Sequence, residues 1–89
     1  MTFRIQTSEG WKVVIFRLSG KIDIESVNEL QRLFGIYGQE RKLILDLRDV
    51  ELVDRDALKF FAKCKANGTQ LKNCPVYVRE WIFRDEHNG

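Results

Sequence analysis

The short apolar run at residues 43–47 (LILDL) constrains the fold most, because helical periodicity stands on both sides of it. The run is too short for a helix and nearly continuous in apolar character, which is typical of a strand covered on both faces of a sheet. Before it, apolar residues fall at spacings of three and four, as on one face of a helix: Val27, Leu30, Phe34 and Tyr37. A central strand that follows a helix indicates an α/β domain.

Two strands are predicted before that first helix. Residues 3–6 alternate apolar and polar side chains, and residues 11–18 are rich in Val, Ile and Phe. The Ser-Glu-Gly turn between them predicts a hairpin, and Trp11 at the rim of the second strand is expected to pack rather than bind. We expect the first helix to begin near Glu25 and to end at about Tyr37, with Gly38 forming a left-handed C-terminal cap.

Two helices and a strand are predicted after the central strand. Asp54 is a suitable N-cap for a second helix. Residues 69–72 then predict a short strand, and Pro75 suits the first position of a last helix, with a strand at residues 76–78 as the alternative. The resulting order, ββαβαβα, predicts a single domain over residues 1–89, with a mixed four-stranded sheet and about three helices.

Charge and composition argue against several functional classes. The 15 basic and 13 acidic side chains give a net charge of only +2, so neither nucleic-acid binding nor a basic membrane anchor is predicted. The longest apolar run, residues 13–16, is far too short to cross a bilayer, and no signal peptide follows Met1, so we expect a cytoplasmic protein. Cys64 and Cys74 lack CxxC spacing and are expected to be free, with a disulfide as the alternative.

The acidic pair of Asp54 and Asp56 is the obvious candidate for catalysis or metal binding. A metal site or an acid/base pair needs convergent partners, because two carboxylates alone do not complete a coordination shell, and the single histidine, His87, lies in a polar tail. The motifs GxxxxGK[ST], GxGxxG, GxSxG and HExxH do not occur. We therefore expect no catalytic residue, no metal and no cofactor, and interpret Asp54 as a helix cap and Asp56 as a favourable charge in the first turn.

A basic stripe follows this acidic pair. Arg55, Lys59 and Lys63 are four residues apart, so they lie on one face of the second helix. Such a row is usually a solvated face. The alternative is a docking site for an acidic partner.

Three strings resemble one known family. LSGKIDIESVNEL resembles its strand, glycine turn, Ile/Leu-Asp and helix with an early Ser or Thr, which here are Gly20, Ile22, Asp23 and Ser26. LILDLRDVELVDRDAL resembles its buried strand followed by apolar-Asp-Ser-Ser/Thr-Gly-Leu, and NGTQLKN is similar to its fourth strand. Together these strings resemble the STAS domain, the fold of bacterial anti-sigma-factor antagonists, over about residues 13–73.

The resemblance implies a regulatory site at the second helix. In the family, a Ser or Thr in this turn is phosphorylated by a partner kinase of the histidine-kinase-like ATPase fold, which is also the anti-sigma factor, and the phosphate abolishes tight binding. By resemblance, Asp54 matches the family Asp, Arg55 the first hydroxyl residue, Asp56 the phosphorylated one and Ala57 the Gly. No hydroxyl stands at residues 53–58, so phosphorylation of this turn is not available. Asp56 supplies one negative charge where a phosphoserine supplies about −1.5 to −2, which makes it an incomplete mimic.

The implied function is a non-catalytic protein-interaction module in bacterial signal transduction and transcription regulation. Its partner would be an anti-sigma factor or an ATPase-fold serine kinase, or it would act as an adaptor in another signalling complex; the oligomeric state is not predicted. The expected partner-binding residues are Asp23, Ile24, Asp54, Arg55, Asp56 and Lys59.

A small-ligand or nucleotide-binding STAS-like domain is the alternative, with its ligand at the strand ends after Asp46 and Val53. Against it, no Gly-rich phosphate cradle precedes the second helix, and Asp56 would repel a phosphate there. Many STAS domains continue with a further strand and helix, so this chain is short at its C-terminus. If the last element is a helix, Tyr77 and Trp81 are expected in the core.

Overall fold

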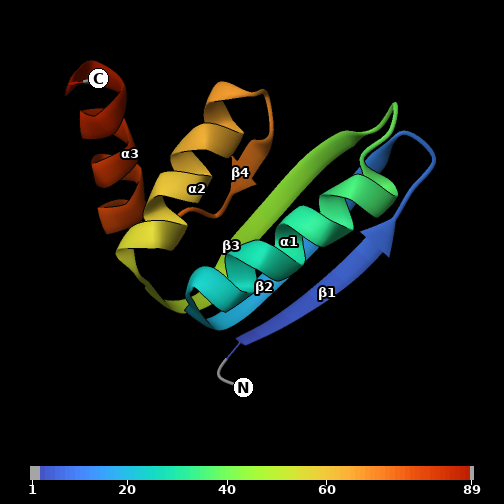
Figure 1. Cartoon of the computed structure of the whole chain (residues 1–89), viewed down its shortest axis with the longest axis horizontal. Helices are drawn as coiled ribbons and strands as arrows, with labels where there is room; N and C mark the ends of the chain where they lie inside the picture. Colours follow the sequence, from blue (N-terminus) through green and yellow to red (C-terminus); the bar gives the residue numbers. More distant parts are fainter. Residues whose placement is uncertain (1–2, 89) are drawn as a thin grey trace.

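Helices and strands alternate after an initial pair of strands in the computed structural model of the protein, which describes residues 3–88 (Figure 1). The sequence correctly predicted the order ββαβαβα, while the alternative strand at residues 76–78 is wrong because a helix starts there. The elements are β1 (Phe3–Glu9), β2 (Val13–Ile22), α1 (Ile24–Tyr37), β3 (Lys42–Val53), α2 (Arg55–Ala66), β4 (Gln70–Lys72) and α3 (Val76–Asn88).

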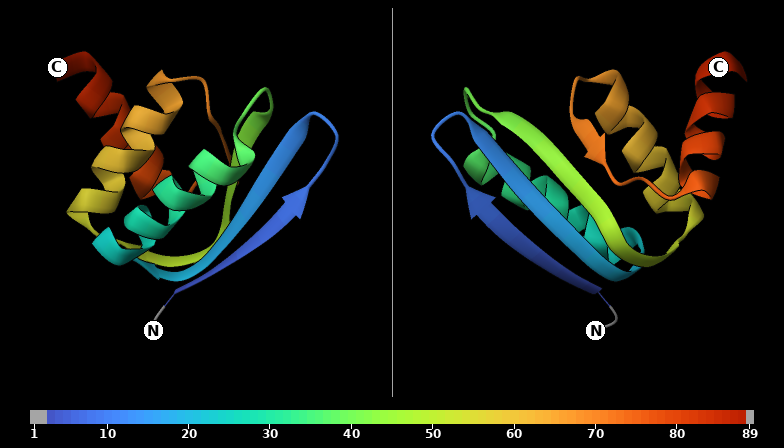
Figure 2. Two further views of the ribbon diagram at one scale, coloured as in Figure 1. Left: turned by 45° about the vertical axis from the view of Figure 1, so that its right-hand side comes forward. Right: turned by 180° about the vertical axis from the view of Figure 1, so that it is seen from behind.

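The four strands form one mixed sheet in the order β1-β2-β3-β4, so β3 is an inner strand as predicted. β1 is antiparallel to β2, and the pairs β2–β3 and β3–β4 are parallel. Helices α1 and α2 make the crossovers, and both lie with α3 on the same side of the sheet (Figure 2). The prediction that β3 is covered on both faces is therefore wrong: Leu45 and Leu47 are fully buried, while Ile44 on the other face is only half-buried.

Both inner strands are longer than predicted. β2 continues past Gly20, whose φ of +84° suits a residue without a side chain, and β3 continues to Val53. The pairing of β3 with β2 contains two register shifts, one between Arg17 and Ser19 and one between Gly20 and Lys21 of β2. Each shift places an extra residue in β3. Because this bulged segment is rich in polar residues, a prediction based on apolar runs ends the strand too early.

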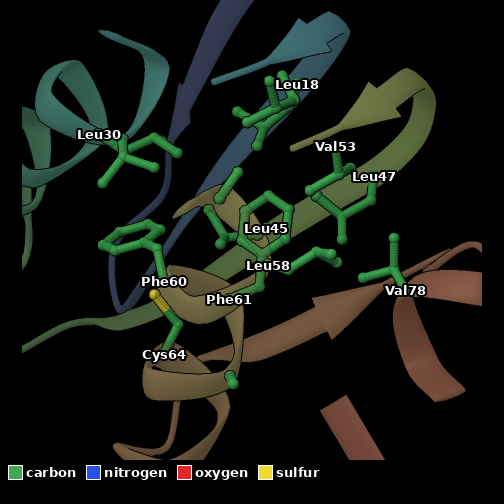
Figure 3. Close-up of a cluster of buried hydrophobic side chains, with 14 of the residues drawn as sticks. Leu18, Leu30, Leu45, Leu47, Val53, Leu58, Phe60, Phe61, Cys64 and Val78 are labelled. Carbon is green, nitrogen blue, oxygen red and sulfur yellow. The ribbon is translucent and has the colours of Figure 1, made fainter. Parts of the chain in front are cut away.

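The core lies between the helices and the sheet (Figure 3). Phe16 of β2 is fully buried, and its ring lies 5.4 Å from that of Phe34 in α1, which lies 5.8 Å from Phe60 in α2. Val78 and Ile82 of α3 are also fully buried, which fixes that helix beside α2. One connected core therefore holds all three helices.

Two aromatic residues depart from their predicted packing. Trp11 is 89% exposed in the turn between β1 and β2, and Tyr77 is 47% exposed on α3. Trp81 is half-buried and packs against the core as predicted. Val78 and Ile82 take the inward face of α3, which leaves Tyr77 at the side of the helix.

Gly38 caps α1, but not in the predicted left-handed conformation. Its φ is −81°, which any residue adopts, and its amide donates to Phe34 O at 2.8 Å. A Cβ at this position would lie 2.5 Å from the same carbonyl oxygen. Close approach of the backbone, rather than a positive φ, is therefore what the glycine provides.

Both cysteines are free thiols, as predicted. Burial raises the pKa of Cys64 to about 12. Burial also raises the pKa of Cys74, although Arg79 and Lys65 act in the opposite direction. Neither thiol has the lowered pKa of a reactive cysteine.

Asp46 is a buried carboxylate on the face of β3 that no helix covers. It is only 5% exposed, and it accepts hydrogen bonds from the Arg48 amide and from Asn73 Nδ2, both at 3.1 Å. Arg17 Nε lies 3.7 Å from its other oxygen. Burial alone would raise the pKa of Asp46, but these hydrogen bonds, with Arg17 and Lys72 nearby, hold it below the ordinary 3.8. Through Asn73, this carboxylate fixes the segment that follows β4.

We predict that Asp46 stabilises the fold in a pH-dependent way. A carboxyl with a lowered folded-state pKa contributes stability above its unfolded pKa, and the contribution is lost as the pH falls through the folded value. At neutral pH, Asp46→Ala should lower the free energy of unfolding by about 1–3 kcal/mol, because the Arg48 amide and the Asn73 side chain lose a charged acceptor. Urea unfolding at a series of pH values measures this. A difference between wild type and variant that stays constant from pH 7 to below pH 3.8 would contradict the assignment.

Candidate functional site

The first turns of α1 and α2 lie side by side at one end of the sheet (Figures 1 and 2). β2 and β3 are parallel and end together, with Ile22 opposite Val53. The amide of Asp54 donates to Ile22 O at 3.0 Å, which joins the start of α2 to the end of β2. The predicted partner-binding residues, which are far apart in the sequence, therefore share one surface.

Each of the two helices begins with an aspartate cap. Asp23 Oδ1 accepts from the Ser26 amide at 3.1 Å, and Ser26 Oγ accepts from the Asp23 amide at 3.2 Å, which completes a capping box. Asp54 Oδ1 accepts from the Ala57 amide at 2.9 Å, as the sequence predicted. These two carboxylates are therefore occupied by their own helices.

The other predicted residues have free polar ends. Arg55, Asp56 and Lys59 are exposed, and none makes a side-chain hydrogen bond or ion pair with the described part of the chain. Ile24, in the first turn of α1, is 49% exposed. Two cations, one carboxylate and one aliphatic side chain thus stand ready for contact from outside. We call the surface formed by the starts of the two helices the helix-start surface. Its residues are Asp23, Ile24, Asp54, Arg55, Asp56 and Lys59.

Leu52 is a surface residue that the sequence-based prediction missed. It lies at the end of β3, opposite Lys21 of β2, and is 54% exposed. The sequence signal was present, because Leu52 sits close to charged residues, two positions before the Asp54 cap. Leu52 was missed because the central strand was predicted to end at Leu47. Together with Ile24, it gives this end of the molecule two exposed aliphatic side chains.

The geometry does not favour the ligand site expected after Asp46. β3 continues well past Asp46, so this residue is not at a strand end, and its carboxylate is occupied by the Arg48 and Asn73 donors. Five hollows on the described surface all lie elsewhere, and none is lined by Asp46, Val53 or a residue of the α2 start.

The described residues contain neither a metal-binding cluster nor a membrane-spanning helix. Among the side chains that the structure describes, those of residues 3–84, no group of three or more His, Cys, Asp and Glu is placed to hold a metal ion. None of the described helices combines the length and the apolar character that crossing a bilayer requires. The backbone at His87 belongs to α3 rather than to an irregular tail, but its side chain lies outside the described part.

Comparison with known proteins identifies the family. Residues 3–72 match the STAS domain family, and the chain belongs to that family. No curated protein sequence matches the chain. The STAS domain of an anti-sigma-factor antagonist from Rhodobacter sphaeroides superposes with a TM-score of 0.58 at 13% identity, over 80% of this chain and 84% of that one. An anti-sigma-factor antagonist from Mycobacterium paratuberculosis gives 0.61 at 21% identity, over 79% of this chain and 64% of that one. At these identities, the likeness is one of fold.

We predict that the two aspartates at the start of α2 differ in their effect on stability. Asp54→Ala removes the cap and should lower the free energy of unfolding by about 1 kcal/mol. Asp56→Ala removes no described hydrogen bond and should change it by less than about 0.5 kcal/mol. Chemical denaturation of both variants measures the difference. Equal losses would mean that Asp56 has a structural role and is not a free contact residue.

Proposed function

We propose that this STAS domain is a non-catalytic protein-interaction module that binds a regulatory partner through the helix-start surface. The single observation that carries the proposal is the exposed, unpartnered group of Arg55, Asp56 and Lys59 beside Ile24. Exposed charged groups without an internal partner contribute little to the stability of the fold, whereas in a complex they add specificity. Ile24 and Leu52 supply the apolar area that an interface core needs.

The partner class follows from the family and from its solved members. Two structures with this fold are of anti-sigma-factor antagonists, which supports an anti-sigma factor as the partner. An ATPase-fold serine kinase is the partner that the family resemblance adds. The protein would then act in the cytoplasm of a bacterium, in signal transduction that controls transcription. An adaptor role in another signalling complex would use the same surface. The proposal treats residues 1–89 as one module, since α1, α2 and α3 share one core.

Asp56 gives this surface a fixed charge. It lies in the first turn of α2, where the helix dipole favours an anion and where the resemblance places the phosphorylated residue of the family. Its carboxylate carries less charge than a phosphate and cannot be removed by a phosphatase. The module therefore has one permanent state in place of two, and Arg55 beside it changes which partner surface fits.

The first experiment compares protein capture by three baits from native cell lysate. The wild type and the control Lys12→Ala/Glu80→Ala should retain the same partner, because Lys12 and Glu80 are exposed outside the helix-start surface and the control also removes one positive and one negative charge. The variant Arg55→Ala/Asp56→Ala should retain roughly tenfold less, since it removes two charged contacts at an interface and introduces no hydroxyl group. Mass spectrometry of the retained proteins quantifies the difference. Equal capture by all three baits would refute this docking surface.

The second experiment tests the role of Asp56 itself. With the captured partner in hand, Asp56→Ser restores a hydroxyl at the position that the resemblance assigns to phosphorylation. If the partner is a kinase, the variant should bind it more tightly and take up phosphate from ATP, whereas the wild type should take up none at this turn. An Asp56→Ser protein with unchanged affinity and no phosphate would count against the fixed-charge role.

A further inference from the structure

The face of the sheet opposite the helices is uncovered and carries mostly basic side chains. Figure 2 shows this face from behind, with no described helix in front of it. In β2, Val14, Phe16 and Leu18 are fully buried under the helices, so the alternate residues of β2 point to the other face. We call this other face the open sheet face.

Strand register identifies the residues of the open sheet face. Residues directly opposite each other on neighbouring strands point to the same face of the sheet. The residues that pair with outward-pointing residues of β2, and their own partners in β4, therefore lie on the open sheet face. The basic residues at these positions come from all four strands: Arg4, Arg17, Lys21, Lys42 and Lys72. The acidic residues are Asp46 and Asp49. Four strands thus bring together cations that are spread along the sequence.

The signs of charge are segregated on this molecule. The five basic and two acidic side chains give this face a net charge of +3, which exceeds the net charge of +2 of the whole chain. The ten basic and eleven acidic side chains elsewhere are nearly balanced. An ordinary solvated surface intersperses both signs, so this excess on one face needs a different explanation.

The buried carboxylate organises the cations rather than neutralising the face. Asp46 is 5% exposed, while the Arg17 side chain beside it remains 56% exposed. Lys72 lies close enough to help lower the pKa of Asp46, which places Arg17 and Lys72 on either side of one carboxylate. Neighbouring strands are about 4.8 Å apart, so these cations form a short row across the sheet. Asp49 is the one exposed acid at the assigned positions.

We propose that the open sheet face binds an acidic peptide segment of a protein partner. Charge complementarity is the basis, because exposed cations on a rigid sheet match spaced carboxylates at little ordering cost. Single-stranded nucleic acid would also require aromatic side chains on which bases stack, and none occupies the assigned positions, whose apolar residues are Val13, Ile15, Ile44 and Leu52. Apart from Leu52, which lies at the border of both, this surface is distinct from the helix-start surface, and the proposal does not depend on the function proposed for that surface.

The test measures binding of a fluorescein-labelled oligoglutamate peptide by fluorescence anisotropy at low salt. Arg4→Gln/Lys72→Gln should weaken binding roughly tenfold, while Lys12→Gln/Lys63→Gln, which removes the same charge from elsewhere, should leave it within about twofold. Asp49→Asn removes the exposed acid and should strengthen binding two- to threefold or so. Binding should also fall as salt is raised, because exposed charges are screened. All altered side chains are exposed, and thermal unfolding of each variant checks that the fold is intact.

Four results would overturn the proposal. The first is no binding of the peptide at low salt, and the second is an equal loss in both double variants, which would mean a general charge effect or a site on the basic stripe of α2. The third is tighter binding of oligouridylate or of phosphatidylserine vesicles that depends on Arg4 and Lys72, which would assign the face to RNA or to lipid. The fourth is self-association without peptide that the Arg4→Gln/Lys72→Gln variant abolishes, which would assign it to a second copy of the chain.

Discussion

The parallel pairing of β2 with β3 is the constraint on which the rest of the structure depends. It runs from Val13 opposite Lys42 to Ile22 opposite Val53, and the extra residues of β3 are absorbed in two register shifts. Because both strands end together, a helix starts beside each end, and the amide of Asp54 bonds across to Ile22 O. The helix-start surface is therefore a product of strand register rather than of any local motif. It is also the edge at which parallel α/β sheets generally place their functional residues.

Carboxylates have divided roles in this small protein. Asp23 and Asp54 cap helices, and Asp46 holds the segment after β4, so each of these three is occupied by internal donors. Asp56 and Asp49 are exposed and make no described hydrogen bond. A domain of this size has little stability to spare, so most of its polar contacts hold helix ends and loops. The residues left free are the ones available to a partner.

The sequence predicts what depends on periodicity and on local chemistry. The change from strand to helical spacing gives the element order, and the capping chemistry of Asp54 correctly places the start of α2. The bulged end of β3 was missed, because a strand whose outward residues are charged does not look apolar, and exposed Leu52 was missed with it. The open sheet face was misjudged because half-buried Ile44 completes an apolar run without being covered.

Cations of the open sheet face could not be grouped from the sequence, since their proximity depends on a register that only the folded sheet defines. The six residues expected at the partner site lie together in space because both helix starts follow parallel strands, and their role in binding stays a prediction. A sequence can thus predict which residues meet at the ends of parallel strands, once those strand ends are recognised. It cannot predict which residues meet across one face of the sheet, because that depends on strand register.

The most direct measurement of the central claim is a chemical-shift map of ¹⁵N-labelled protein titrated with the partner recovered by capture. The account predicts perturbed amides in two segments, residues 22–26 and 52–59, with those of α3 unchanged. Perturbations centred on α3 or on the β1–β2 turn near Trp11, with the two helix starts unaffected, would contradict it.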